Sequence, residues 1–138
     1  MREFSLKILA ADRLLYDGRA VYVNLPLEDG EMGVLAGHGS MISAVVPGVL
    51  SFRVQEDDRE RDAAVSAGIV EITGSSVLVL VDTAEYAEDI DINRAERAAK
   101  RAKEAMQTEK SRREYTAREF ELARALGRLR AARKKYKL

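Results

Sequence analysis

Residues 75–106 read SSVLVLVDTAEYAEDIDINRAERAAKRAKEAM and contain two hydrophobic periodicities in succession. The first eight residues are rich in Val and Leu, which is typical of a buried β-strand. From Ile90 onward the apolar residues recur with helical spacing and form one stripe, made of Ala95, Ala98, Ala99, Ala102, Ala105 and Met106. Carboxylates at Glu88, Asp89 and Asp91 lie before or within the first turn, where they suit the free N–H groups and the helix dipole. The change after Thr83 predicts two domains, residues 1–86 and residues 87–138.

The first domain contains short apolar runs of the kind that form β-strands. These runs are FSLKILA (4–10), RAVYVNLPL (19–27), GVLSFRV (48–54), DAAVSAGIVEI (62–72) and SSVLVLVD (75–82). They are separated by the turn-forming segments YDG (16–18), EDG (28–30), PG (47–48), QEDDRE (55–60) and TGSS (73–76). Because no helical period interrupts the runs, they predict an antiparallel β-sandwich or barrel rather than a parallel βαβ sheet. Together with the helices that follow, the predicted fold class is α+β.

The second domain is expected to be a helical hairpin. A polar stretch at residues 107–113 is the best place for a turn, and a second helix follows it. The apolar face of that helix is predicted to carry Tyr115, Leu122, Leu126, Leu129 and Tyr136. Two helices of about 20 residues would each be about 30 Å long. An alanine stripe buries little apolar area, so we expect a hairpin that is only marginally docked.

The net charge of zero conceals a strong asymmetry. Residues 1–86 carry 7 Lys and Arg against 14 Asp and Glu, whereas residues 87–138 carry 16 against 9. The two domains are therefore expected to attract different partners. The chain has no cysteine, which excludes disulfides, thiolate zinc sites and thiol nucleophiles. No apolar run approaches about 20 residues and no secretory signal pattern is present, so a soluble, cytosolic protein is expected.

Residues 29–48, DGEMGVLAGHGSMISAVVPG, hold five of the nine glycines and the single histidine. A phosphate-binding loop needs converging glycine N–H groups followed at once by a helix, usually with a lysine. Here a strand-like run follows, and no lysine lies between Lys7 and Lys100. We therefore expect turns and bulges in a sheet, with His38 as a turn or packing residue. No catalytic constellation and no metal site are predicted in this domain.

The segment from Gly30 to His38, with Pro47-Gly48 after it, resembles the hallmark of the epsilon subunit of bacterial F-type ATP synthases. The later stretch from SAGIVEI to AAKRA is similar to the same family, so the resemblance covers essentially the whole chain. Two local departures are Gly39-Ser40-Met41, where members commonly have Ala-Pro-Leu, and AADRLLYDG (10–18), where many have a proline.

The resemblance implies a ten-stranded β-sandwich seated on the gamma subunit and the c-ring, followed by a hairpin with two states. In that family the hairpin lies compact on the sandwich, or it extends along gamma towards the alpha/beta head and blocks ATP hydrolysis. Such a chain is a non-catalytic rotor subunit that requires no cofactor. It is peripheral to the cytoplasmic face of the bacterial membrane and contacts it only through the c-ring. The resemblance also implies subunit contacts, which on this chain fall on Glu31, Val34, Leu35, His38 and Met41.

Some members of the family bind ATP through an Ile/Leu-Asp-x-x-Arg-Ala motif. This chain matches the motif at Ile90, Asp91, Arg94 and Ala95. The other family positions fall on Glu85, Arg101, Arg124 and Arg128. Folding the hairpin would gather four guanidiniums, which a triphosphate could neutralise with forked hydrogen bonds, while Asp91 or Glu85 could accept from the adenine amino group or the ribose. ATP, with or without Mg²⁺, is thus an expected regulatory ligand.

Other interpretations of the basic hairpin remain open. The arginines could form a solvated face, or pair with carboxylates of the beta subunit when the hairpin is extended. A nucleic-acid-binding module is the alternative function, but the hairpin retains nine carboxylates and few stacking aromatics, so no nucleic-acid partner is expected. A stand-alone enzyme is disfavoured by the single histidine and the lack of a paired-acid motif.

Overall fold

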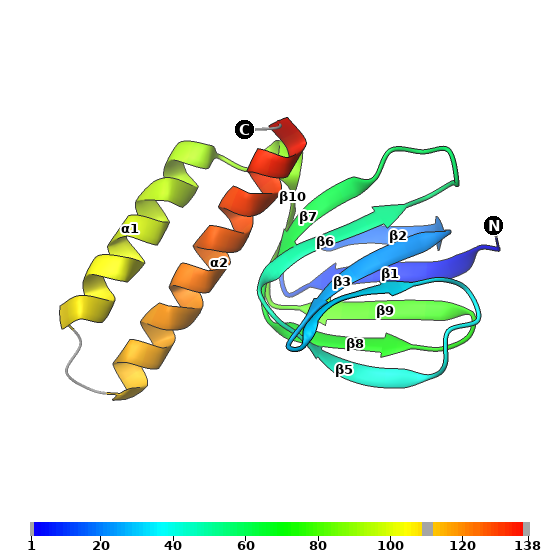
Figure 1. Ribbon diagram of the computed structural model, residues 1–138, viewed down its shortest axis with the longest axis horizontal. Coiled ribbons are helices and arrows are strands. Elements are labelled where there is room, and N and C mark those ends of the chain that lie inside the picture. The colour runs from blue at the N-terminus through cyan, green and yellow to red at the C-terminus, as the bar shows by residue number, and fades with distance from the viewer. Residues whose placement is uncertain (1, 109–111, 137–138) are drawn as a thin grey trace.

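Figure 1 shows a β-sandwich beside a two-helix hairpin in the computed structural model, which describes residues 2–108 and 112–136. The α+β fold predicted from the sequence is confirmed. The strands are β1 (Phe4–Ala10), β2 (Leu14–Ala20), β3 (Tyr22–Leu27), β4 (Gly30–Val34), β5 (Met41–Val45), β6 (Gly48–Arg53), β7 (Arg61–Val65), β8 (Gly68–Ile72), β9 (Ser76–Val81) and β10 (Ala84–Tyr86). A short 3₁₀ turn, η1 (Ala87–Asp89), leads to the helices α1 (Ile92–Thr108) and α2 (Arg112–Tyr136).

The strands run in the order β10-β7-β6-β3-β5-β8-β9-β1-β2, and β4 pairs with β3. All the strand pairs are antiparallel except β1 and β9, which are parallel from Ser5 and Ser76 to Ala10 and Val81. The predicted antiparallel sandwich therefore contains one parallel pair that the sequence pattern did not indicate. Short turns force antiparallel neighbours, but β1 and β9 come from distant parts of the chain, so no hairpin fixes their relative direction.

The segment YDG (16–18), predicted as a break, lies inside β2. Gly18 pairs with Leu6 of β1, and a Cβ added at Gly18 would lie 2.9 Å from the Tyr16 hydroxyl oxygen. The Tyr16 hydroxyl lies over the glycine and donates a hydrogen bond to the Arg19 carbonyl oxygen, 2.6 Å away. Glycine here makes room for a side chain rather than for a turn, a use that the Asp-Gly pattern does not reveal.

Turns and strands account for the glycine-rich stretch, as predicted. Gly30, at the turn between β3 and β4, has φ 120°, and Gly37 has φ 85°; both lie in the region that L side chains rarely adopt. The Gly37 N–H donates to the carbonyl oxygen of Gly74 at 2.8 Å, so this amide holds two loops together and does not point at an anion.

The helices are layered on one side of the sandwich, with α2 between α1 and the sheet (Figure 1). The second helix packs on β6 and β7. A separate apolar cluster forms there; its buried members are Val49, Ala64, Ala87, Ile90, Ala95, Ala99, Ala125, Leu129, Ala131 and Ala132. Most of these side chains are alanines, so the helices approach closely but bury little apolar area per residue. The predicted stripe on α1 is confirmed at Ala95, Ala99 and Ala102, all buried.

The predicted apolar face of α2 is only partly correct. Leu129 is buried and Leu122 is half-buried, but Tyr115 is 43% exposed and Leu126 is 48% exposed. Because α2 packs on α1 and on the sheet, its buried surface runs around the helix, and small residues occupy most of it. A search for large apolar side chains overlooks such a surface. The side chain of Tyr136 and residues 109–111 of the predicted turn lie outside the described residues.

Candidate anion-binding site

An open hollow of about 460 Å³ lies between the two helices. Its floor contains the small side chains of Ala98, Ala102 and Ala125. Its walls carry five arginines, Arg94, Arg101, Arg118, Arg124 and Arg128, and the single carboxylate Glu121. The four arginines singled out in the sequence therefore lie around one hollow. The balance of five guanidiniums to one carboxylate gives the hollow a strongly positive lining, of the kind that suits a polyanion.

Three of these guanidiniums lie outside the ion pairs that the described residues form with one another. Among the ion pairs formed by the described residues, none involves Arg94, Arg101 or Arg124. Like charges gathered without counterions repel one another, and an anion in the hollow removes this repulsion. The hollow is present only while α1 and α2 lie side by side, because both helices contribute to its walls.

The Ile90–Ala95 motif has mainly structural roles in this arrangement. Ile90 is 7% exposed and belongs to the cluster between the helices and the sheet, and Ala95 is fully buried in the same cluster. The Asp91 Oδ1 accepts the N–H of Arg94 at 3.1 Å, so Asp91 is the N-cap of α1. Of the motif residues, only Arg94 lines the hollow.

Glu85 on β10 does not line the hollow, but it forms an ion pair with Arg128, which does. The Arg128 Nε donates to Glu85 Oε2 at 3.0 Å, and Nη2 donates to Oε1 at 3.3 Å. The two side chains are 22% and 24% exposed, so this forked pair is partly shielded from water. On the opposite side of Arg124 and Arg128 lies a smaller cavity of about 190 Å³ that Glu85 lines. Glu85 thus anchors α2 to the sheet and holds Arg128 in the wall between the two spaces.

A second polar contact fastens the C-terminal end of α2. The Lys134 Nζ lies 3.0 Å from Asp62 Oδ1, donates to Ser51 Oγ at 3.0 Å and lies 3.4 Å from Glu60 Oε2. Ser51, although buried, is satisfied because its hydroxyl donates to Asp62 Oδ1 at 2.7 Å. We call Lys134, Ser51, Asp62 and Glu60 the lysine clasp. Burial alone lowers the pKa of Lys134, but the hydrogen bond and charge of Asp62, with Glu60, outweigh it and raise that pKa.

Two charged residues of the hollow were not singled out in the sequence. Arg118 and Glu121 form an ion pair in which Arg118 Nη1 lies 3.0 Å from Glu121 Oε2. The spacing of positions 118, 121, 125 and 128 follows one face of α2. Extending the helical face of Arg128 towards the N-terminus of α2 would have found both residues.

Two family models together match nearly the whole chain. One, described as the beta-sandwich domain of the ATP synthase delta/epsilon chain, matches residues 3–87. The other, described as its long alpha-helix domain, matches residues 88–133. The chain belongs to the ATP synthase delta/epsilon family.

Curated relatives place it with the epsilon chains of this family. The ATP synthase epsilon chain of Ruminiclostridium cellulolyticum is 42% identical over 135 residues, which cover 98% of this chain and 99% of the relative. The epsilon chain of Bordetella avium is 38% identical, covering 97% of this chain and 94% of the relative. The resemblance predicted from the sequence is confirmed, and the chain is an epsilon-type subunit.

Solved structures with the same fold belong to ATP synthases. A chain in the mitochondrial ATP synthase of Euglena gracilis, solved with OSCP, F1 and c-ring, superposes with a TM-score of 0.80 at 23% identity, covering 94% of this chain and 81% of that one. A chain from the central stalk and c-ring of the Tetrahymena thermophila mitochondrial ATP synthase gives a TM-score of 0.64 at 10% identity, covering 95% and 97%. At these identities the likeness establishes the fold.

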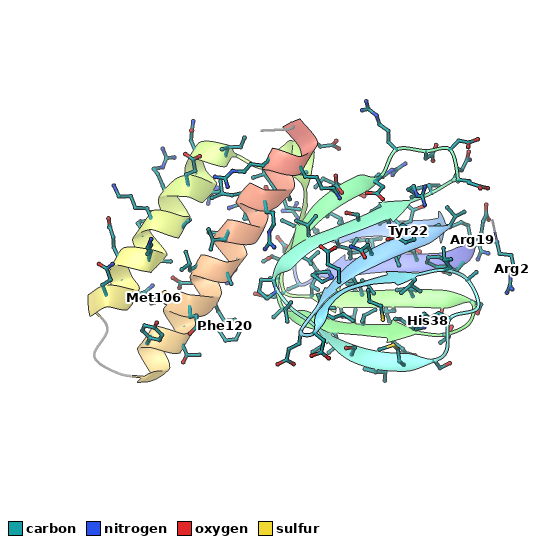
Figure 2. All side chains as sticks on the ribbon, viewed as in Figure 1. Arg2, Arg19, Tyr22, His38, Met106 and Phe120 are labelled. Carbon is teal, nitrogen blue, oxygen red and sulfur yellow. The ribbon has the colours of Figure 1, made fainter. Side chains whose placement is uncertain are left out.

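The residues predicted to contact other subunits of an ATP synthase lie in and after β4. Val34 is 1% exposed in the sandwich core, and Met41 packs partly against that core. Leu35 is 48% exposed, and Glu31 is exposed and accepts the Asn24 amide at 3.1 Å. His38, labelled in Figure 2, is half-buried, and its Nδ1 lies 2.7 Å from the Gly39 carbonyl oxygen. Glu31, Leu35 and His38 are therefore accessible to a partner, whereas the Val34 side chain is not.

The described residues form neither a membrane-spanning helix nor a cluster of metal-ligating side chains. Neither α1 nor α2 has an apolar stretch long enough and free enough of charge to cross a bilayer within the part that the structure describes. No group of three or more His, Asp or Glu side chains in that part is arranged to hold a metal ion.

Proposed function

We propose that this epsilon-type chain is a non-catalytic central-stalk subunit that couples the catalytic head of an ATP synthase to its c-ring. Its sandwich would sit on the gamma subunit and the c-ring, at the cytoplasmic face of the membrane. Its hairpin would restrain ATP hydrolysis when it leaves the sandwich and reaches the alpha/beta head. ATP would oppose this release by binding the compact hairpin.

The outer face of the sandwich supports a docking surface for another subunit. Strand pairing places five apolar residues side by side across β5, β8, β9, β1 and β2, in the row Ala44, Ile69, Leu80, Leu9 and Leu14. Ile69 is 48% exposed and Leu14 is 52% exposed, while Ile42 beside the row is 71% exposed. A row of apolar side chains left in water marks a contact with a partner. The gamma subunit is the partner that we assign to it.

The contact between the hairpin and the sandwich supports release. Its apolar part consists mainly of alanines, and its polar part is the Glu85–Arg128 pair and the lysine clasp. In both contacts a basic residue of α2 pairs with acidic residues of the sandwich. The opposite charges of the two domains therefore help to hold the hairpin against the sandwich. A partner that offers carboxylates can replace these contacts without a large loss of buried apolar area.

The observation that carries the proposed ATP response is the arginine hollow. A ligand shifts an equilibrium only if it binds one state better than the other. Separation of α1 and α2 dismantles the hollow, so an anion bound there stabilises the compact state. At a free ligand concentration of 100 times Kd the stabilisation is about 2.7 kcal/mol, which is enough to reverse a marginal docking equilibrium.

A titration of the isolated chain tests the ATP site. We expect ATP to release heat on binding, and Arg101→Ala to weaken binding by at least about tenfold because it removes a charge-assisted contact. Arg97→Ala is the matched control, since Arg97 lies on the same helix, is exposed and does not line the hollow. No heat with ATP, or equal losses in both variants, would exclude this site.

The conformational response can be followed separately. The chain has no cysteine, so two introduced cysteines, Ser75→Cys on the sandwich and Gln107→Cys at the end of α1, can carry a donor and an acceptor dye. We expect ATP to increase the fraction with the compact energy-transfer value. Binding of ATP without any change in that fraction would leave a nucleotide site but remove the regulatory role.

The subunit role has its own test. Tagged chain isolated from its native cell should carry gamma, beta and c-ring subunits with it. A variant with Ile69→Asp and Leu80→Asp in the apolar row should lose gamma while its hairpin stays docked. Recovery of none of these subunits with the unaltered chain would refute the proposal.

A further inference from the structure

A small open cavity of about 160 Å³ lies between α2 and the turns of the sandwich that face the helices. We call this cavity the notch. It is lined by two residues of α2 and by residues of three turns, namely Phe120, Arg124, Pro47, Ser66, Ala67 and Asp82. The notch lies between α2 and the sandwich, whereas the arginine hollow lies between α2 and α1.

Phe120 is a large apolar side chain that docking of the hairpin leaves in water. It lies on the same face of α2 as Gly127, two helical turns away. A Cβ at Gly127 would lie 3.4 Å from the Gly48 nitrogen, so α2 touches the sheet at that point. Towards its N-terminus α2 diverges from the sandwich (Figure 1), and Phe120, labelled in Figure 2, remains 54% exposed. The notch is the space that this divergence leaves between Phe120 and the turns.

The notch adjoins the apolar row on the outer face of the sandwich. Ile69 follows the turn that contains Ala67, and Leu80 precedes the turn that contains Asp82. Ile69 is 48% exposed and Leu80 is 36% exposed, so exposed apolar side chains continue from the row, across these turns, to Phe120. A contiguous apolar surface of this kind marks a contact with a partner.

The apolar row is too small to hold a partner by itself. Its five strands, about 4.8 Å apart, make it about 19 Å long and about 7 Å wide. Each side of a standard interface buries about 800 Å². The neighbouring row on the same face contains the exposed charged side chains Glu71, Lys7 and Asp17, whereas the centre of an interface is depleted of charge. A partner on the apolar row therefore gains further apolar contact by extending towards α2.

We propose that the surface for the gamma subunit is composite: gamma covers the apolar row and inserts an apolar side chain into the notch, against Phe120. This inference rests on the gamma-binding face proposed above. The notch is large enough, because an apolar cavity of about 150 Å³ accommodates benzene. Its two charged residues, Arg124 and Asp82, have opposite signs, so the notch has no net charge that would favour an ionic group.

The composite surface couples gamma binding to the state of the hairpin. Because α2 forms one wall of the notch, the notch is present only while the hairpin is docked. Gamma bound to both parts therefore favours the compact state, and docking of the hairpin strengthens gamma binding by the same factor.

Binding of the full chain to the purified gamma subunit of the same ATP synthase, without the alpha/beta head and without nucleotide, tests the inference. Phe120→Ala should weaken this binding about tenfold, because an aromatic side chain buried in an interface carries a large share of the affinity. Tyr115→Ala is the matched control, since Tyr115 is 43% exposed on the same helix and does not line the notch. It should change the affinity by less than about twofold.

Energy transfer between dyes at positions 75 and 107 gives a second measurement. We expect gamma to raise the compact fraction of the unaltered chain and of Tyr115→Ala, but not that of Phe120→Ala. Without gamma the three chains should have the same compact fraction, because Phe120 is mostly exposed in the docked hairpin. A lower compact fraction in Phe120→Ala without gamma would assign Phe120 to docking of the hairpin and overturn the inference.

The outcomes separate this inference from the proposed function. If gamma does not bind the unaltered chain, or binds equally after Ile69→Asp with Leu80→Asp, the gamma-binding face fails and the composite surface fails with it. If that double substitution abolishes binding but Phe120→Ala behaves like Tyr115→Ala, the face on the sandwich stands and the inference is overturned. A compact fraction that falls when gamma binds also overturns it, because gamma would then prefer the released hairpin.

Discussion

Replacing Lys134 with methionine removes the charge from the lysine clasp while keeping a long apolar side chain. The substitution deletes the ammonium contacts to Asp62 Oδ1 and Ser51 Oγ, each at 3.0 Å. The Asp62 side chain is 10% exposed, so it cannot recover full hydration, but it keeps the hydrogen bond from Ser51 at 2.7 Å. We therefore expect a weaker contact between the end of α2 and the sheet, with the sandwich itself unchanged.

The size of the effect follows from the exposure of the partners. A hydrogen bond to a charged group contributes about 1.5–3 kcal/mol when shielded, and exposed ion pairs contribute about 0–1 kcal/mol. The Lys134 side chain is 47% exposed, so the shielded value must be reduced, and we expect a loss of about 1 kcal/mol. This loss raises the equilibrium constant for release of α2 from the sheet about fivefold.

Hydrogen exchange of the amides in α2 measures this equilibrium. Most helical stability comes from tertiary packing, so amides near residues 128–132 should exchange about fivefold faster in Lys134→Met. Lys103→Met is the control, because Lys103 is exposed on α1 and lies outside the clasp. Raising the salt concentration should reduce the difference in exchange rate between Lys134→Met and the unaltered chain, because salt screens the ion pairs of the lysine clasp. Equal exchange in Lys134→Met and the unaltered chain would show that the clasp does not contribute to docking.

Three further perturbations test other contacts of the hairpin. Gly127→Leu should release α2 from the sheet, because even a Cβ at Gly127 would lie 3.4 Å from the Gly48 nitrogen, which leaves no room for a larger side chain. The substitution raises helix propensity by about 0.8 kcal/mol, so energy transfer should fall while the far-ultraviolet dichroism stays intact. Docking that persists would contradict the close approach of α2 to β6. Asp91→Ala should lower the stability of α1 by about 1 kcal/mol through loss of the N-cap, while Asp91→Asn keeps it; equal thermal melts for both would argue against capping. Alkaline pH should undock the hairpin, because the pKa of Lys134 is raised in the docked state. The stabilisation of docking by Lys134 is complete below its ordinary pKa of about 10.4 and is lost as the pH rises through the folded-state pKa. Burial also raises the pKa of Tyr86, so its ionisation above about pH 10 disfavours folding in the same direction; an energy-transfer signal unchanged across this range would refute the linkage.

Much of the fold followed from periodicity in the sequence. The change after Thr83 separated strands from helices because alternation and helical spacing place apolar residues differently. The parallel pairing of β1 with β9 could not be predicted in this way, since it depends on contacts between distant segments and not on a local pattern. The apolar surface of α2 was misassigned at Leu126 because packing on two sides uses alanines, which carry a weak hydrophobic signal.

The candidate site was partly accessible from the sequence for a different reason. Helical spacing indicated that Arg94 and Arg101 share a face, and the structure places them with Arg124 and Arg128 around one hollow. The capping role predicted for the carboxylates before α1 is confirmed at Asp91. Spacing alone could not decide between this role and ligand binding, because both favour the same residue type at the same place. Nor could it show the contact between Glu85 and Arg128, which are 43 residues apart in the chain.

That contact determines how Arg128 can act in both docking and anion binding. A guanidinium has five N–H donors, and Glu85 engages Nε and one N–H of Nη2. The remaining three can reach an anion in the hollow while the pair with Glu85 persists. Docking and anion binding then reinforce each other, because the anion stabilises an arginine that the sheet already orients. Glu85→Gln should therefore weaken both hairpin docking and ATP affinity. If Glu85 instead competed with the anion for Arg128, the same substitution would loosen docking but strengthen ATP binding, so one titration of this variant decides between the two.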